Sequence, residues 1–136
     1  MSTLATAQRS SLRLPRLDVI RPLWLRVVVG ASGVALLASA FWVSPHAWIV
    51  WVALIAPDVP GLAGAGRDLS PKQMHPRAVR YYNLTHRLTG GALVGIAALA
   101  TASPTLTAIC LAWLAHVLID RALGYTLRTS DGFLRQ

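Results

Sequence analysis

Two histidines and two aspartates are the residues of this sequence whose types and spacing could do chemistry. His116 and Asp120 are four positions apart in "LAHVLIDRALGY", so on a helix they share one face. Asp58 follows a proline in "LIAPDVPGLAG", and His86 ends "YYNLTH". Imidazole nitrogens and carboxylate oxygens are donors that Zn²⁺, Mn²⁺ and Fe²⁺ accept. The residue types therefore predict a divalent-metal site made of Asp58, His86, His116 and Asp120.

Such a metal site could support hydrolysis of a membrane-associated substrate. A bound divalent cation polarises a substrate oxygen and activates a coordinated water. The sequence contains no His-Glu-x-x-His or Cys-x-x-Cys motif, so the spacing alone does not identify the metal. Further polar side chains are expected to orient the ligands or to hold substrate, and these are Asn83, Arg87, Arg121, Tyr82 and Tyr125.

Three other functions could use the same polar residues. Intramembrane polar groups also link helices by hydrogen bonds, so the cluster could be purely structural in a non-enzymatic interaction protein. His86 and His116 could instead ligate a haem from opposite sides, with Arg87 and Arg121 at its propionates. Chains of Asp and His also form proton or solute relays, for which so small a chain would need to form a homo-oligomer. The residue pattern leaves these alternatives open.

The composition of the chain places these residues in a membrane. Of 136 residues, 54% are hydrophobic and only 13% are charged, and the mean hydropathy is +0.51. Soluble proteins have about 25% charged residues, so this chain could hardly cover a soluble surface. The net charge of +8 comes mainly from arginines that flank apolar segments. This pattern favours a lipid bilayer with anionic head groups as the partner and argues against nucleic acid.

Four apolar segments predict an all-α fold, an integral membrane four-helix bundle. Each segment is near the length of about 20 residues that crosses a bilayer. In chain order the segments cover about residues 22–43, 45–65, 81–101 and 104–124. The expected domains are a basic N-terminal tail, a four-span transmembrane domain and a short C-terminal tail, at residues 1–21, 22–125 and 126–136.

The basic residues predict the orientation of the four spans. Lysines and arginines lie before the first segment, between the second and third, and after the fourth, whereas the connections "VSPHAW" and "TASPTL" contain none. By the positive-inside rule both termini are then cytoplasmic (N-in/C-in), and the polar cluster lies in the cytoplasmic half. A cleaved signal peptide ending at Ala38-Ser39-Ala40 is the competing interpretation of the first segment. Cleavage there would leave an odd number of spans.

Three stretches, "LIAPDVPGLAG", "YYNLTH" and "LAHVLIDRALGYTL", resemble a family of small bacterial membrane proteins known as domain of unknown function 4260, over about residues 22–133. The resemblance implies a multi-pass protein of the bacterial inner (plasma) membrane with about four helices, and it implies no activity. The signature positions that it implies are Asp58, Asn83, His86, His116, Asp120 and Arg121. The sequence departs from the family pattern in Thr126, where a second glycine is usual, and in its final "LRQ", which lacks a histidine.

Overall fold

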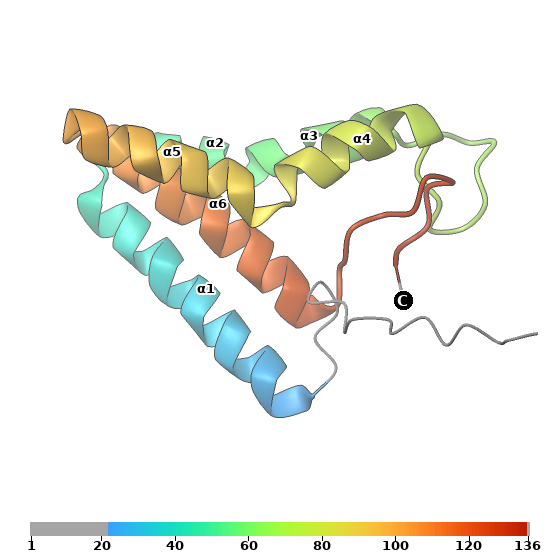
Figure 1. Cartoon of the computed structure of the whole chain (residues 1–136), viewed down its shortest axis with the longest axis horizontal. Coiled ribbons are helices and arrows are strands. Elements are labelled where there is room, and N and C mark those ends of the chain that lie inside the picture. Colours follow the sequence, from blue (N-terminus) through green and yellow to red (C-terminus); the bar gives the residue numbers. More distant parts are fainter. Residues whose placement is uncertain (1–21, 136) are drawn as a thin grey trace, which may run out of the picture.

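The computed structural model describes residues 22–135, so the expected basic tail at 1–21 lies outside the described residues. The described chain is all-helical apart from one isolated β-bridge between Arg128 and Leu134, which confirms that the fold is all-α. The elements in chain order are α1 (Leu23–Val43), α2 (Ala47–Ile55), the 3-10 turn η1 (Ala56–Asp58), α3 (Val59–Ala63), α4 (Pro76–Thr85), α5 (Leu88–Thr101) and α6 (Pro104–Leu123) (Figure 1).

Helix α6 is the centre of the molecule. It packs against α1, α2 and α5, and α1 runs antiparallel along its length (Figure 1). Small residues allow the close approach, because a Cβ at Gly33 would lie 2.8 Å from Ile119 Cγ1 and 3.2 Å from Ala115 O. On the α5 side, a Cβ at Gly91 would lie 2.6 Å from Leu114 Cδ2. Close contact over small residues is how apolar helices associate in a bilayer, where no hydrophobic effect drives them together.

Two helices of the described chain, α1 and α6, are long and apolar enough to cross a membrane. Only 11% of the apolar window of α1 is buried, so α1 is not the core helix of a soluble domain. The tryptophans near its two ends, Trp24 and Trp42, are 68% and 91% exposed. Tryptophan is enriched at both membrane–water interfaces. These features indicate a membrane protein.

Two of the expected spans are not continuous helices. The segment 45–65 is interrupted near its middle, and the segment 81–101 is interrupted near its start. The segment 45–65 is broken by η1, where Pro57 has no N–H to donate to the helical ladder. The segment 81–101 differs from the continuous helix that we expected, because α4 begins earlier and ends at Thr85, and Arg87 is extended before α5 begins. Helices α3 and α4 pack against each other and diverge from the C-terminal half of α6 (Figure 1).

The residues after α6 form a folded segment that packs on α4. The side chain of Asn83 donates to the carbonyl of Arg128 at 2.9 Å and accepts from its N–H at 2.8 Å. The N–H of Arg135 donates to the carbonyl of Leu127 at 2.9 Å. We call residues 126–135 the C-terminal segment. Its contacts attach the end of the chain to α4, beside the polar cluster.

Candidate metal centre

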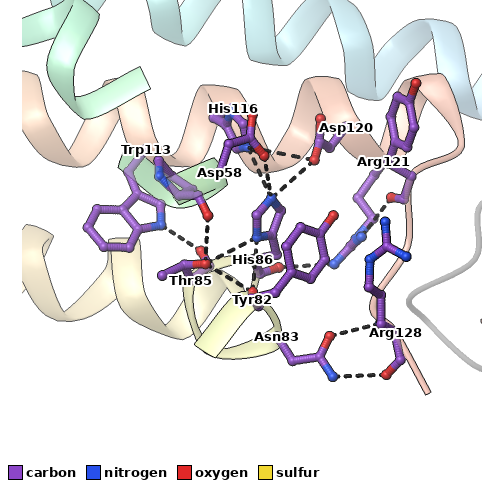
Figure 2. Close-up of polar contacts among 12 residues, drawn as sticks. Asp58, Tyr82, Asn83, Thr85, His86, Trp113, His116, Asp120, Arg121 and Arg128 are labelled. Atoms are coloured by element: carbon purple, nitrogen blue, oxygen red, sulfur yellow. Dashed lines mark hydrogen bonds and ion pairs between the residues drawn. The ribbon is translucent and has the colours of Figure 1, made fainter. Parts of the chain in front are cut away.

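The four predicted metal ligands converge at one point. They come from η1, from the residue that caps α4, and from the last two turns of α6 (Figure 2). Each residue offers one ligand atom, and the four atoms lie within 4.8 Å of one another. We call this group of Asp58, His86, His116 and Asp120 the His/Asp cluster.

The distances within the His/Asp cluster have the size of a tetrahedral metal site. His86 Nε2 lies 3.2 Å from His116 Nε2, 3.3 Å from Asp58 Oδ1 and 3.4 Å from Asp120 Oδ2. His116 Nε2 lies 3.6 Å from each of the same two oxygens. A tetrahedral zinc ion with ligands at about 2.0–2.2 Å separates those ligands by about 3.3–3.6 Å. Five of the six donor pairs therefore have the spacing of ligands around one small cation, and the remaining pair, Asp58 with Asp120, lies within 4.8 Å.

The second ring nitrogen of His86 determines what its Nε2 can do. Its Nδ1 lies 2.9 Å from the carbonyl of Tyr82. Since a carbonyl only accepts, Nδ1 carries the proton, and Nε2 of the neutral ring presents a lone pair. That lone pair faces the oxygens of Asp58 and Asp120, which are also acceptors. A histidine held in this way by a backbone carbonyl has the orientation typical of metal ligands.

The burial of the His/Asp cluster is uneven. His86 has no exposed surface and His116 is 9% exposed. The side chain of Asp120 is 17% exposed, whereas that of Asp58 is 51% exposed. With both carboxylates ionised and both imidazoles neutral, the cluster carries two negative charges, and buried charges are normally paired or coordinate metals. The cluster is therefore closed on the histidine side and open to its surroundings at Asp58.

The break between α4 and α5 is held in place by side chains from neighbouring elements. The carbonyl of Thr85 accepts from Trp113 Nε1 at 2.8 Å, and the carbonyl of His86 accepts from an Arg121 Nη at 3.0 Å. The hydroxyl of Thr85 lies 2.9 Å from the carbonyl of Pro57, which joins this break to the one at η1. Non-helical backbone at membrane depth is tolerated where its polar groups find such partners. These contacts direct His86 toward α6.

Five residues were expected to orient the ligands or to hold substrate. Three of them lie against His86 or against the arginine that bonds its carbonyl. The ring of Tyr82 stacks on that of His86, with centroids 3.8 Å apart. Arg121 donates to the carbonyls of both His86 and Tyr125, at 3.0 and 2.7 Å. Tyr82 and Arg121 therefore fix the position of His86, and Tyr125 contributes its backbone to that arrangement.

The remaining two expected residues lie apart from the cluster, and two others were missed. Asn83 points toward the backbone of Arg128 (Figure 2), and Arg87 is exposed at the start of α5. A role for them in substrate binding stays a prediction. Thr85 and Trp113, which hold the break, were not expected from the sequence. A tryptophan within an apolar segment is the available signal, since a buried indole N–H usually finds an acceptor.

The distance between the two histidines is incompatible with the haem alternative. Their Nε2 atoms are 3.2 Å apart, and both lie within 3.6 Å of the aspartate oxygens. The plane of a porphyrin does not fit between nitrogens so close together. The His/Asp cluster instead has room for one small cation or for protons.

The sequence comparisons agree with the earlier resemblance. The family model described as "Domain of unknown function (DUF4260)" matches residues 23–135. The match includes every described helix and all four residues of the His/Asp cluster. No curated protein and no solved structure matches the chain. The chain belongs to the DUF4260 family, whose defining domain is one of unknown function.

Proposed function

We propose that this protein binds one divalent metal ion in the His/Asp cluster and uses it to hydrolyse a membrane-associated substrate. The observation that carries the proposal is the convergence of four donor atoms within 4.8 Å of one another, with five of the six pairs separated by 3.2 to 3.6 Å. Two nitrogens and two oxygens in this geometry suit Zn²⁺ first, and Mn²⁺ or Fe²⁺ next. A divalent ion would also balance the charge of Asp58 and Asp120.

The proposed setting is the bacterial inner membrane, crossed four times with both termini in the cytoplasm. The N-terminal end of α1 meets the C-terminal end of α6, because Arg26 Nε donates to the carbonyl of Ala122 at 2.7 Å. An even number of spans requires these two ends to share one side. The connections at the other ends of these helices carry no lysine or arginine. The positive-inside rule then makes the Arg26 end cytoplasmic, in contact with anionic lipid head groups.

The residues of the cluster have distinct roles in the proposed hydrolysis. A bound divalent cation supplies Lewis acidity toward a substrate oxygen. His86 and His116 would hold the cation from the buried side of the cluster. The half-exposed carboxylate of Asp58 lies on the open side, where it could accept a proton from an attacking water. This division of roles places substrate entry at Asp58.

A structural metal site is the second candidate, and one observation favours it. Four protein donors would fill the coordination sphere of a tetrahedral ion, as they do in structural zinc sites, whereas catalytic sites keep one position open. In this case the ion would link η1, the α4–α5 break and α6 in a non-enzymatic membrane protein. The two candidates differ in whether Asp58 remains a ligand when substrate is present.

Elemental analysis of the full chain, purified in detergent without chelators and reconstituted with zinc, tests metal binding. We expect about one equivalent of metal in the wild type and a loss of most of it in His116→Ala and Asp120→Ala. His46→Ala and Asp68→Ala are matched controls, because they remove the same groups at exposed positions outside the cluster. Substoichiometric wild-type metal, or metal retained in His116→Ala, would overturn the proposal.

Hydrolysis of ester, amide and phosphoester substrates in mixed micelles separates the two candidates. If the protein binds metal and no class is cleaved, and if Asp58→Asn releases the metal as readily as Asp120→Asn, the site is structural. Cleavage that disappears in Asp58→Asn while metal remains bound supports the hydrolase.

A further inference from the structure

A groove lies between α4 and the C-terminal segment, next to the His/Asp cluster but separate from it. Its volume is about 310 Å³, and its lining includes Arg80, Asn83, Arg128, Ser130 and Arg135. Figure 2 shows Tyr82 between His86 on one side and Arg128 on the other, with the arginine 5.2 Å from the ring centroid. The groove is thus on the far side of Tyr82 from the His/Asp cluster. We call it the arginine groove.

The lining of the arginine groove contains three arginines and no carboxylate. One Nη of Arg128 donates to the carbonyls of Lys72 and Gly132, at 2.9 and 2.8 Å, and both of these acceptors are neutral. The Nε of Arg128 is buried and has no acceptor within the described chain. A buried donor without an acceptor is costly, so an anion that accepted from this Nε would stabilise the arrangement.

The backbone holds the arginines of this groove close together. The bridge between Arg128 and Leu134 brings the two arms of the C-terminal segment side by side, and Arg135 Nε donates to the carbonyl of Arg128 at 3.3 Å. Arg80 is one helical turn before Asn83, whose amide is bonded to the backbone of Arg128. Neighbouring like charges repel each other. Three guanidinium groups gathered around one hollow are the arrangement expected for binding an anion.

We propose that the arginine groove binds a phosphate group, as a monoester or diester, through Arg80, Arg128 and Arg135. The guanidinium fork matches phosphate oxygens in a bidentate geometry, which the ammonium group of lysine does not. The hydroxyl of Ser130 is a further donor in the lining. A volume of about 310 Å³ exceeds that of a bare phosphate and leaves room for a head group. The phosphate could belong to an anionic lipid or to a soluble ester, and the site does not depend on bound metal.

Titration calorimetry of the full chain in an uncharged detergent tests the proposal with two probes, inorganic phosphate and short-chain phosphatidylglycerol. We expect saturable binding that weakens about tenfold or more in Arg80→Gln and in Arg135→Gln. Arg77→Gln is the matched control, because Arg77 lies on the same helix one turn from Arg80 and is not in the groove lining. Arg80→Lys keeps the charge and loses the fork, so we expect intermediate affinity.

The outcomes of this titration are distinct. Binding of phosphatidylglycerol together with much weaker binding of phosphate would identify a lipid head group as the ligand, and comparable binding of both would identify a soluble phosphate ester. An equal loss in Arg77→Gln and Arg80→Gln would indicate diffuse attraction and overturn the site, as would the absence of saturable binding. Metal content measured on the same samples should be unchanged in Arg80→Gln, so a failure of the groove would not be mistaken for a failure of the metal site.

Discussion

The Nε2 atoms of His86 and His116 lie 3.2 Å apart, although 30 residues separate the two histidines along the chain. Because Nδ1 of His86 faces the carbonyl of Tyr82, a neutral His86 ring would bring the lone pair of Nε2 to this meeting point. Asp58 and Asp120 bring oxygens to the same place. Either a metal ion or a proton could lie among these atoms. The two cases predict different changes in stability when one of the four side chains is replaced.

Asp120→Asn should therefore have different effects with and without metal. In the chelated protein it removes one of two neighbouring negative charges, so we expect the unfolding midpoint to stay constant or to rise. With zinc at about a hundred times its dissociation constant, the wild type gains about 2.7 kcal/mol, and the variant should gain much less. Thermal unfolding in detergent, with EDTA or with zinc, measures both effects. If His–Asp hydrogen bonds alone hold the cluster, the substitution lowers the midpoint equally under both conditions.

Arg121→Lys should weaken metal binding without touching a ligand. The guanidinium group reaches the carbonyls of His86 and Tyr125 at once, and a lysine ammonium cannot reproduce that fork. Changes to groups that support metal ligands typically cost 10–100-fold in affinity, so we expect a loss of about tenfold in a zinc competition assay. Arg87→Lys, at the exposed neighbouring position, is the control and should bind zinc like the wild type. Equal affinities in all three proteins would contradict a positioning role for Arg121.

Thr85→Val should destabilise the fold by about 1 kcal/mol. Valine has nearly the same shape but lacks the hydroxyl that lies 2.9 Å from the carbonyl of Pro57, and a typical hydrogen bond contributes about this much. The same substitution at Thr89, which is exposed on α5, provides the control. Unfolding midpoints of both variants in one detergent test the difference. An equal loss of stability in Thr89→Val would mean that the hydrogen bond between Thr85 and Pro57 makes no specific contribution.

Gly33→Ala and Gly90→Ala should change stability in opposite directions. A Cβ at Gly33 meets Ala115 O at 3.2 Å and Ile119 N at 3.3 Å, so α1 and α6 must separate, at about 1–3 kcal/mol. A Cβ at Gly90 meets Trp113 at an ordinary 3.4 Å, and alanine in a helix is favoured over glycine by about 0.5–1 kcal/mol. Unfolding of both variants is the measurement. Similar midpoints would contradict the close packing of α1 on α6.

The two long helices could be predicted from the sequence because the residues that start and end a helix are its own neighbours in the chain. Segment 104–124 matches α6, which begins at Pro104 and ends before Gly124 in the left-handed conformation, with φ 94°. The break at η1 also has a local cause, because Pro57 has no N–H to donate to the helical ladder. The break at His86 and Arg87 was not expected, since neither residue prevents a helix. It depends on acceptors and donors supplied by Pro57, Trp113 and Arg121, which a local pattern cannot contain.

The same break explains which site residues could be predicted. His116 and Asp120 share a face of one unbroken helix, so their spacing was sufficient. On a continuous helix, Asn83 would share a face with His86. In the structure α4 ends at Thr85, and the chain turns so that His86 faces α6 while Asn83 faces the C-terminal segment. The position of Pro76 in the first turn of α4 was a local sign that this helix starts early.

The order of the cluster residues along the chain has a consequence for biogenesis. Asp58 is synthesised first, His86 follows, and His116 and Asp120 come last, on the helix that also carries Trp113. A product truncated before α6 lacks two of the four donor atoms and the indole that holds the α4–α5 break. It would keep only Asp58 and His86 of the His/Asp cluster. Completion of the cluster therefore requires that α6 be synthesised and packed against the earlier helices.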